Sequence, residues 1–206
     1  VARVLRLKER LGLFAMGKPS QRALSGEYEL LGAPDHRAVA REAVRKSMVL
    51  LKNTGVLPLQ PGSRILVAGD AANDIARQSG GWTLSWQGTG LENDLFPGAT
   101  SLWSGIEQAA TATGGSAQLS EDGTFTQRPD AAIVIFGETP YAEFQGDIAT
   151  LQLRPELRGP IATMRRLKEQ GIPVVAVMIT GRPLYVNEAL NTADAFVAAW
   201  LPGSEG

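Results

Sequence analysis

The chain has 206 residues, of which 44% are hydrophobic and 20% charged, and its formal net charge is -1. This length suits one well-packed domain with an added tail or linker, and the charge balance gives no reason to expect nucleic acid as a partner. The absence of cysteine and the single histidine, His36, exclude disulfides and leave too few ligands for a usual zinc site, so we expect no metal and no cofactor. No apolar run approaches the roughly 18 to 20 residues that cross a bilayer, so we expect no membrane partner.

Both ends of the sequence resemble parts of a longer chain. Val1 begins a charged helical pattern without a methionine or a signal-type apolar core, and residues 201–206 stop in a turn just after an apolar run. We expect residues 1–11 to be a helix of a preceding domain and residues 12–35, rich in Gly, Pro and Ser, to be an extended linker. Residues 36–206 then form the main domain, truncated at its C-terminal side.

The main domain begins with a predicted amphipathic helix over residues 36–52, for which Asp35 is a good N-cap. Continuous apolar runs predict strands that are buried on both faces, at Ile65–Ala68, Ala131–Phe136, Val174–Ile179 and Ala195–Trp200. Helical patterns cover residues 101–112, 156–170 and 184–190, and a short strand is expected at 117–119. This alternation predicts an α/β fold, with a largely parallel sheet covered by helices on both faces.

In an open parallel sheet, ligands bind beyond the carboxyl ends of the strands, so the loops that follow the four strands are where chemistry is expected. The first loop, Gly69–Asp74, lacks the Gly-x-Gly-x-x-Gly spacing that lets backbone approach a pyrophosphate, which argues against a dinucleotide. Asp70 and Asn73 in this loop are either turn formers and helix caps or residues that face a ligand.

Two tryptophans, Trp82 and Trp86, follow in a loop bracketed by glycines over residues 78–88. A tryptophan offers a flat apolar face to sugar C–H groups and an N–H donor, although packing is its commoner role. The neighbouring glycines permit close approach of a ligand and so favour a binding role.

The segment Gly137–Asp147 holds three carboxylates, Glu138, Glu143 and Asp147, directly after a buried strand. Cleavage of a glycosidic bond needs a carboxylic acid that protonates the leaving oxygen, and aromatic neighbours such as Tyr141 and Phe144 would raise a glutamate's pKa by desolvation. A solvated acidic loop is the competing interpretation, and the spacing alone does not choose between the two.

Taken together, these segments resemble glycoside hydrolase family 3, the β-glucosidases and exo-acting β-glucan glucohydrolases. The resemblance is carried by residues 36–53 with Leu57-Pro58-Leu59, by Gly80-Gly81-Trp82 with Trp86-Gln87-Gly88, by the motif Glu-x-Pro-Tyr-x-Glu-x-x-Gly-Asp over residues 138–147, and by residues 201–206. It implies that residues 1–11 end a (β/α)8-like barrel domain that carries an aspartate nucleophile, and that residues 36–206 are the α/β sandwich domain that carries the acid/base glutamate.

By position in this motif, Glu143 matches the family's acid/base, and Trp86 matches one of two tryptophans that clamp the sugar on the leaving-group side. Glu138 and Asp147 are the alternative acids, and Trp82, Glu138 and Asp147 are further candidates for binding the substrate or shaping the loops around it. Phe144 and Gln145 stand where relatives often differ.

The resemblance implies an exo-acting β-glucosidase or β-glucanase that hydrolyses β-linked glucosides from the nonreducing end with retention. Its partners would be a β-glucoside or β-glucan oligosaccharide and the barrel domain, its place periplasmic or extracellular, and the segment alone would be inactive. A noncatalytic carbohydrate-binding or structural module remains as an alternative. A phosphorylase or N-acetylglucosaminidase is disfavoured, because those relatives usually carry the acid/base on the barrel domain.

Overall fold

The computed structural model describes residues 1–206 and divides into two compact units, Val1–Ala40 and Arg41–Gly206. The first unit contains helix α1 (Ala2–Arg10), two short 3-10 turns at Pro19–Gln21 and Tyr28–Leu30, and the beginning of α2 (Pro34–Ser47). No residue of α1 is buried. No helix of the chain is both long enough and apolar enough to span a membrane.

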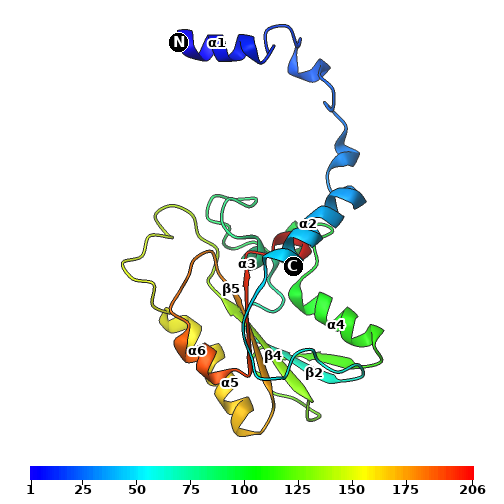
Figure 1. The fold of residues 1–206 in the computed structure, drawn as a ribbon, viewed down its shortest axis with the longest axis vertical. Coiled ribbons are helices and arrows are strands. Elements are labelled where there is room, and N and C mark those ends of the chain that lie inside the picture. The colour runs from blue at the N-terminus through cyan, green and yellow to red at the C-terminus, as the bar shows by residue number, and fades with distance from the viewer. The chain divides into compact units, whose positions relative to one another are not determined.

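The second unit is built on a six-stranded sheet with the strand order β1-β6-β5-β4-β2-β3, of which β2, β4 and β5 are labelled in Figure 1. The strands are β1 (Val49–Asn53), β2 (Arg64–Ala68), β3 (Ser116–Leu119), β4 (Ala131–Gly137), β5 (Val174–Ile179) and β6 (Ala195–Trp200). All neighbouring pairs are parallel except β1 and β6, which are antiparallel. The predicted α/β fold with a largely parallel sheet is therefore confirmed.

Helices cover both faces of this sheet. On one face, α5 (Arg158–Glu169) and α6 (Asn187–Thr192) pack on side chains such as Phe136 and Phe196. On the other face, α4 (Leu102–Ala112) covers residues that include Ile133 and Ile135. Figure 1 shows α4 across the sheet from the α5–α6 pair. All seven residues of β4 are buried, as expected for a central strand without a polar face.

The four predicted buried strands are confirmed, and so is the short strand near residue 117. The predicted helix over 36–52 is wrong at its end: α2 stops at Ser47, and Val49–Asn53 form an edge strand that pairs with β6. The apolar residues of this stretch are compatible with a helix or with a strand, and pairing with the distant strand β6 makes it a strand.

Three helix boundaries also differ from the prediction. Asp35 lies inside the first turn of α2 and not at its N-cap, because Pro34 begins the helix, a position that suits proline's fixed φ. The pattern over 184–190 corresponds to α6, which begins only at Asn187. The pattern over 156–170 divides into a 3-10 turn, Pro155–Leu157, and α5.

Candidate functional site

The loops at the carboxyl ends of β2 and β4 bring the candidate site residues together. After β2, the chain forms the short helix α3 (Ile75–Ser79) and then the tryptophan loop, residues 80–88. After β4 comes the acidic loop, residues 138–147. Direct hydrogen bonds join the two loops, between residues that are 55 to 61 positions apart in the sequence.

Glu143 is the point at which the two loops meet. Its Oε2 accepts hydrogen bonds from the indole N–H of Trp86 at 2.7 Å and from that of Trp82 at 3.2 Å. The hydrogen bond from Trp86 is the main cause of a lowered pKa of Glu143, and Trp82 adds to it. The carboxylate remains open to solvent, so the site presents a charged oxygen framed by two indole rings.

The expectation that Tyr141 and Phe144 raise the pKa of a glutamate in this loop is wrong for Glu143, whose pKa is lowered. The Phe144 side chain is 74% exposed and meets the edge of Trp86 rather than covering the carboxylate. The hydrogen bond from Trp86 and one from the backbone N–H of Glu143 itself favour the charged form; together with a smaller contribution from Trp82 they outweigh desolvation, and the pKa moves down.

The tryptophan loop holds its two rings close together. The backbone N–H of Trp82 donates to the backbone carbonyl of Trp86 at 2.9 Å. The ring centroids of the two residues are 6.1 Å apart, with a 40° angle between the ring planes. Trp82 and Leu84 both have positive φ angles, a strained conformation that this tight loop requires. Both indole rings remain exposed, at 69% for Trp82 and 46% for Trp86, so their faces are open to a ligand.

Close backbone packing explains two glycines of this region. A Cβ at Gly81 would lie 2.2 Å from Tyr141 O, and one at Gly146 would lie 2.7 Å from Ala142 O. Glycine is therefore needed where the tryptophan loop crosses the acidic loop and where the acidic loop turns back on itself.

Gln87 joins the two loops and was not among the predicted site residues. Its Nε2 donates to Glu143 O at 2.9 Å, and its Oε1 accepts from the N–H of Ala142 at 2.7 Å. The side chain thus holds the backbone on both sides of the peptide that leads into Glu143. The sequence feature that could have pointed to Gln87 is an amide side chain next to a tryptophan in a glycine-rich loop.

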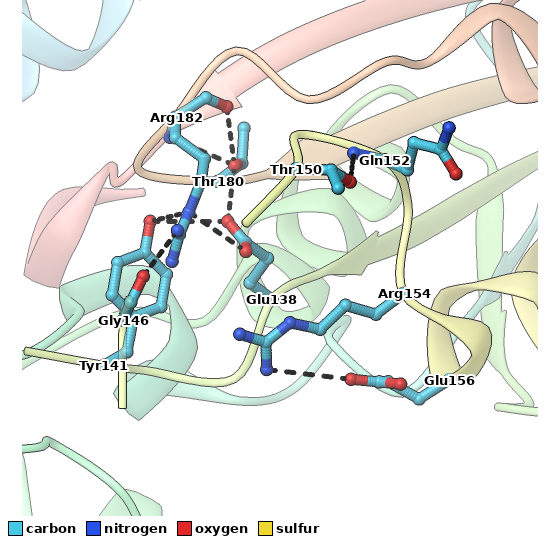
Figure 2. A network of polar contacts seen from close by, with 9 residues as sticks. All are labelled: Glu138, Tyr141, Gly146, Thr150, Gln152, Arg154, Glu156, Thr180 and Arg182. Atoms are coloured by element: carbon cyan, nitrogen blue, oxygen red, sulfur yellow. Dashed lines mark hydrogen bonds and ion pairs between the residues drawn. The ribbon is translucent and has the colours of Figure 1, made fainter. Parts of the chain in front are cut away.

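Glu138 has a different environment from Glu143. It is 8% exposed, pairs with Arg182 Nε through Oε1 at 3.2 Å, and accepts through Oε2 from the Thr180 hydroxyl at 2.9 Å (Figure 2). Asp147 is exposed and its carboxylate makes no hydrogen bond or ion pair. Of the three acids in this loop, only Glu143 contacts the tryptophan pair.

Asp70 and Asn73 are tied into the turn that follows β2. Asp70 pairs with Arg77 at 2.8 Å, and Asn93 donates its side-chain N–H to Asn73 O at 3.0 Å. Both residues also line an open hollow of 470 Å³ that extends along residues 88–93. A smaller pocket of 140 Å³, lined in part by Asp70, Glu138 and Tyr141, lies between the ends of β2 and β4.

Arg182 and Thr180, in the loop after β5, were also missed. Arg182 Nε donates to the Tyr141 hydroxyl at 2.6 Å, and Nη1 donates to Gly146 O at 2.7 Å. A charged residue directly after a buried parallel strand was the signal in the sequence. No group of three or more His, Cys, Asp and Glu side chains is arranged to hold a metal ion.

The sequence profile described as "Glycosyl hydrolase family 3 C-terminal domain" matches residues 48–206. The chain belongs to this family. The domain shares 54% identity and a TM-score of 0.92 with the crystal structure of an exo-1,3/1,4-beta-glucanase from a Pseudoalteromonas species, over 97% of this chain and 25% of that chain.

Two curated relatives of the domain are named β-glucosidases. The lysosomal beta glucosidase of Dictyostelium discoideum is 30% identical over 100% of this chain and 27% of the relative. The periplasmic beta-glucosidase of Salmonella typhimurium is 28% identical over 83% of this chain and 26% of the relative. The chain thus spans about a quarter of the length of the proteins that it matches.

Proposed function

We propose that this chain is the acid/base domain of an exo-acting β-glucosidase or β-glucanase that cleaves β-linked glucosides from the nonreducing end with retention. The observation that carries the proposal is the contact of one solvent-open carboxylate, that of Glu143, with two indole N–H groups. The 54% identity to an exo-1,3/1,4-beta-glucanase supports the choice of reaction and of β-glucan as substrate class.

In the proposed reaction, Glu143 first acts as an acid. It donates a proton to the departing glycosidic oxygen while an aspartate on a preceding barrel domain, with its carboxyl group roughly 5 to 5.5 Å from that of Glu143, attacks the anomeric carbon and forms a covalent glycosyl-enzyme. The Glu143 carboxylate then takes a proton from the water that releases the sugar from that aspartate. This second step regenerates both carboxyl groups.

The proton of the first step requires a higher pKa than Glu143 has in this chain, where Trp86 and Trp82 lower it. A nearby nucleophile carboxylate and a sugar that excludes water both disfavour the charged form of a glutamate. Docking of the barrel domain and binding of substrate would therefore supply the upward shift. Once the nucleophile has reacted, its charge is gone and the indole donors favour the carboxylate that acts as base.

The two tryptophans have a second role in this proposal. Their exposed faces give the leaving-group sugar an apolar platform next to the proton donor. Trp86, with the shorter hydrogen bond, is the expected principal contact, and Trp82 shapes the loop. Glu138 and Asp147 would influence the substrate site indirectly, through the acidic loop that carries Glu143.

The proposal extends to the domain organisation and location of the whole protein. We propose that α1 belongs to the end of the barrel domain, that residues 12–35 link the two domains, and that the enzyme works outside the cytoplasm, in the periplasm or beyond the cell. The names of the two β-glucosidase relatives, one lysosomal and one periplasmic, agree with a place outside the cytosol.

The test is Glu143→Ala in the complete enzyme, assayed with an activated aryl glucoside and with laminaribiose or cellobiose. Loss of a general acid lowers the rate by about 10²- to 10⁴-fold. We expect this loss mainly on the disaccharides, because their leaving groups need a proton. Azide, which needs no general base, should partly restore turnover of the aryl glucoside. Equal losses on both substrates, or none, would contradict the assignment and favour a noncatalytic carbohydrate-binding module.

A further inference from the structure

One arginine from outside the acidic loop holds that loop at both ends. Arg182 Nε donates to the Tyr141 hydroxyl at 2.6 Å, and its guanidinium carbon lies 3.7 Å from the centre of the Tyr141 ring. Nη1 of the same group donates to Gly146 O at 2.7 Å. Figure 2 shows this guanidinium between Tyr141, Gly146 and Glu138. Glu143 lies midway along the segment that these contacts enclose.

A buried countercharge holds the arginine in place. The side chains of Arg182 and Glu138 are only 12% and 6% exposed, and Nε and Oε1 are 3.2 Å apart. The Thr180 hydroxyl lies 2.9 Å from Glu138 Oε2 and accepts from the Arg182 N–H at 3.2 Å. Because Thr180 and Glu138 follow the neighbouring strands β5 and β4, the arginine is anchored to the ends of two paired strands of the sheet.

The opposite side of the acidic loop is held by the tryptophan loop. Gln87 fixes the backbone at Ala142 and Glu143, and the indole groups fix the carboxylate. The segment itself is a single turn, with Gly146 N–H donating to Ala142 O at 2.8 Å. Such a turn has few bonds of its own, so its position depends on the groups that hold it from the two sides.

We propose that Arg182, neutralised by Glu138, is the positioning residue for Glu143, which sets the reach of the proposed acid/base toward the glycosidic oxygen. This inference rests on the proposed function. The contacts of Arg182 are with Tyr141, Gly146 and Glu138 and not with the Glu143 carboxylate, so it acts on Glu143 through residues 141–146. Glu138 thus serves as the countercharge of the positioning arginine and not as a proton donor.

The experiment compares four forms of the complete enzyme with the parent: Arg182→Lys, Glu143→Ala, the double variant, and Arg165→Lys. Lysine keeps the charge that Glu138 needs, but its single ammonium does not reproduce the planar fork that reaches Tyr141 and Gly146 together. Arg165→Lys is the matched control, because Arg165 pairs with Glu188 at 2.5 Å on an exposed part of α5. Each form is assayed on an activated aryl glucoside and on laminaribiose, with thermal melting to correct for the folded fraction.

A small misplacement of a catalytic group lowers the rate by about 10- to 100-fold, and we expect such a loss for Arg182→Lys on laminaribiose. Turnover of the aryl glucoside should change far less, since its leaving group needs little protonation. In the double variant, the lysine should add nothing on laminaribiose to the loss caused by Glu143→Ala, because the positioned group is already absent. Arg165→Lys should match the parent.

An equal loss on both substrates, or a further loss in the double variant, would overturn the inference and leave Arg182 as a purely structural residue. If Glu143→Ala shows no dependence on the leaving group, the proposed function fails, whatever Arg182→Lys does. Should Arg182→Lys not fold, Glu138→Gln tests the inference instead, through the ratio of its rates on laminaribiose and on the aryl glucoside. That variant keeps the shape and one acceptor of the side chain but removes the countercharge, and an unchanged ratio would overturn the inference.

Discussion

The indole N–H of Trp86 lies 2.7 Å from Oε2 of Glu143, and that of Trp82 lies 3.2 Å from the same oxygen. A carboxylate that accepts two N–H donors is favoured over its protonated form. The tryptophan pair, and Trp86 above all, therefore lowers the pKa of Glu143.

Replacement of Trp86 by phenylalanine should raise the pKa of Glu143, because the Trp86 hydrogen bond is the main cause of its lowered pKa. Trp82→Phe should raise it less, since its N–H is farther away. The titration of the Glu143 carboxyl carbon, followed by NMR in the 206-residue chain, measures both shifts. Trp103→Phe, in α4, is the control and should leave the titration unchanged; equal titration curves for Trp86→Phe and the parent would contradict the contact.

Gly81→Ala should destabilise the domain by about 1 to 3 kcal/mol, because the added methyl group would overlap the backbone at Tyr141 O, 2.2 Å away. The matched control is Gly159→Ala in α5, where the added Cβ meets nothing within 4 Å. Alanine is the better helix former there, so the control should be neutral or more stable by up to about 1 kcal/mol. Urea unfolding of the chain measures both changes, and similar midpoints for the two variants would count against the close crossing of the loops.

Gln87→Ala should loosen the acidic loop without unfolding the domain. Its side chain makes two hydrogen bonds to the backbone at Ala142 and Glu143, and these are the bonds that the variant loses. Hydrogen exchange in residues 141–147 should become faster, while exchange in β4 stays slow because that strand is fully buried. Unchanged exchange in the loop would show that Gln87 does not hold it.

Asp194 supports the opposite end of the sheet, where it accepts from Lys168 Nζ at 2.5 Å and from the Val174 N–H at 2.9 Å. Burial by itself would raise the pKa of Asp194, but these donors together lower it from its ordinary value of 3.8. A lowered pKa stabilises the folded chain above the ordinary value, and this contribution is lost as the pH falls through the folded-state pKa.

Asp194→Asn should therefore cost about 1 to 3 kcal/mol of unfolding free energy at neutral pH, the usual effect of losing a partly buried charged acceptor. The difference from the parent should shrink as the pH drops below 3.8, where the parent loses the same charge. Thermal unfolding across this range measures it. Asp147→Asn, at an exposed carboxylate without partners, should follow the parent throughout, and a pH-independent cost for Asp194→Asn would refute the electrostatic explanation.

The local pattern of apolar residues was sufficient to predict the main fold. Runs such as Ala131–Phe136 are apolar throughout because a central strand is covered on both faces, and this leaves a signal in the sequence itself. The motif around residues 138–147, through its resemblance to family 3, singled out Glu143 among three acids as the proposed acid/base.

Tertiary structure decided what depends on partners distant in the chain. Val49–Asn53 form a strand because they pair with the edge of β6. The pKa of Glu143 is lowered mainly by the indole N–H of Trp86, which comes from another loop. The Arg182–Glu138 pair exists because β4 and β5 end side by side. Local periodicity shows which face of an element is buried, but hydrogen bonds and ion pairs depend on distances in space that only the folded chain sets.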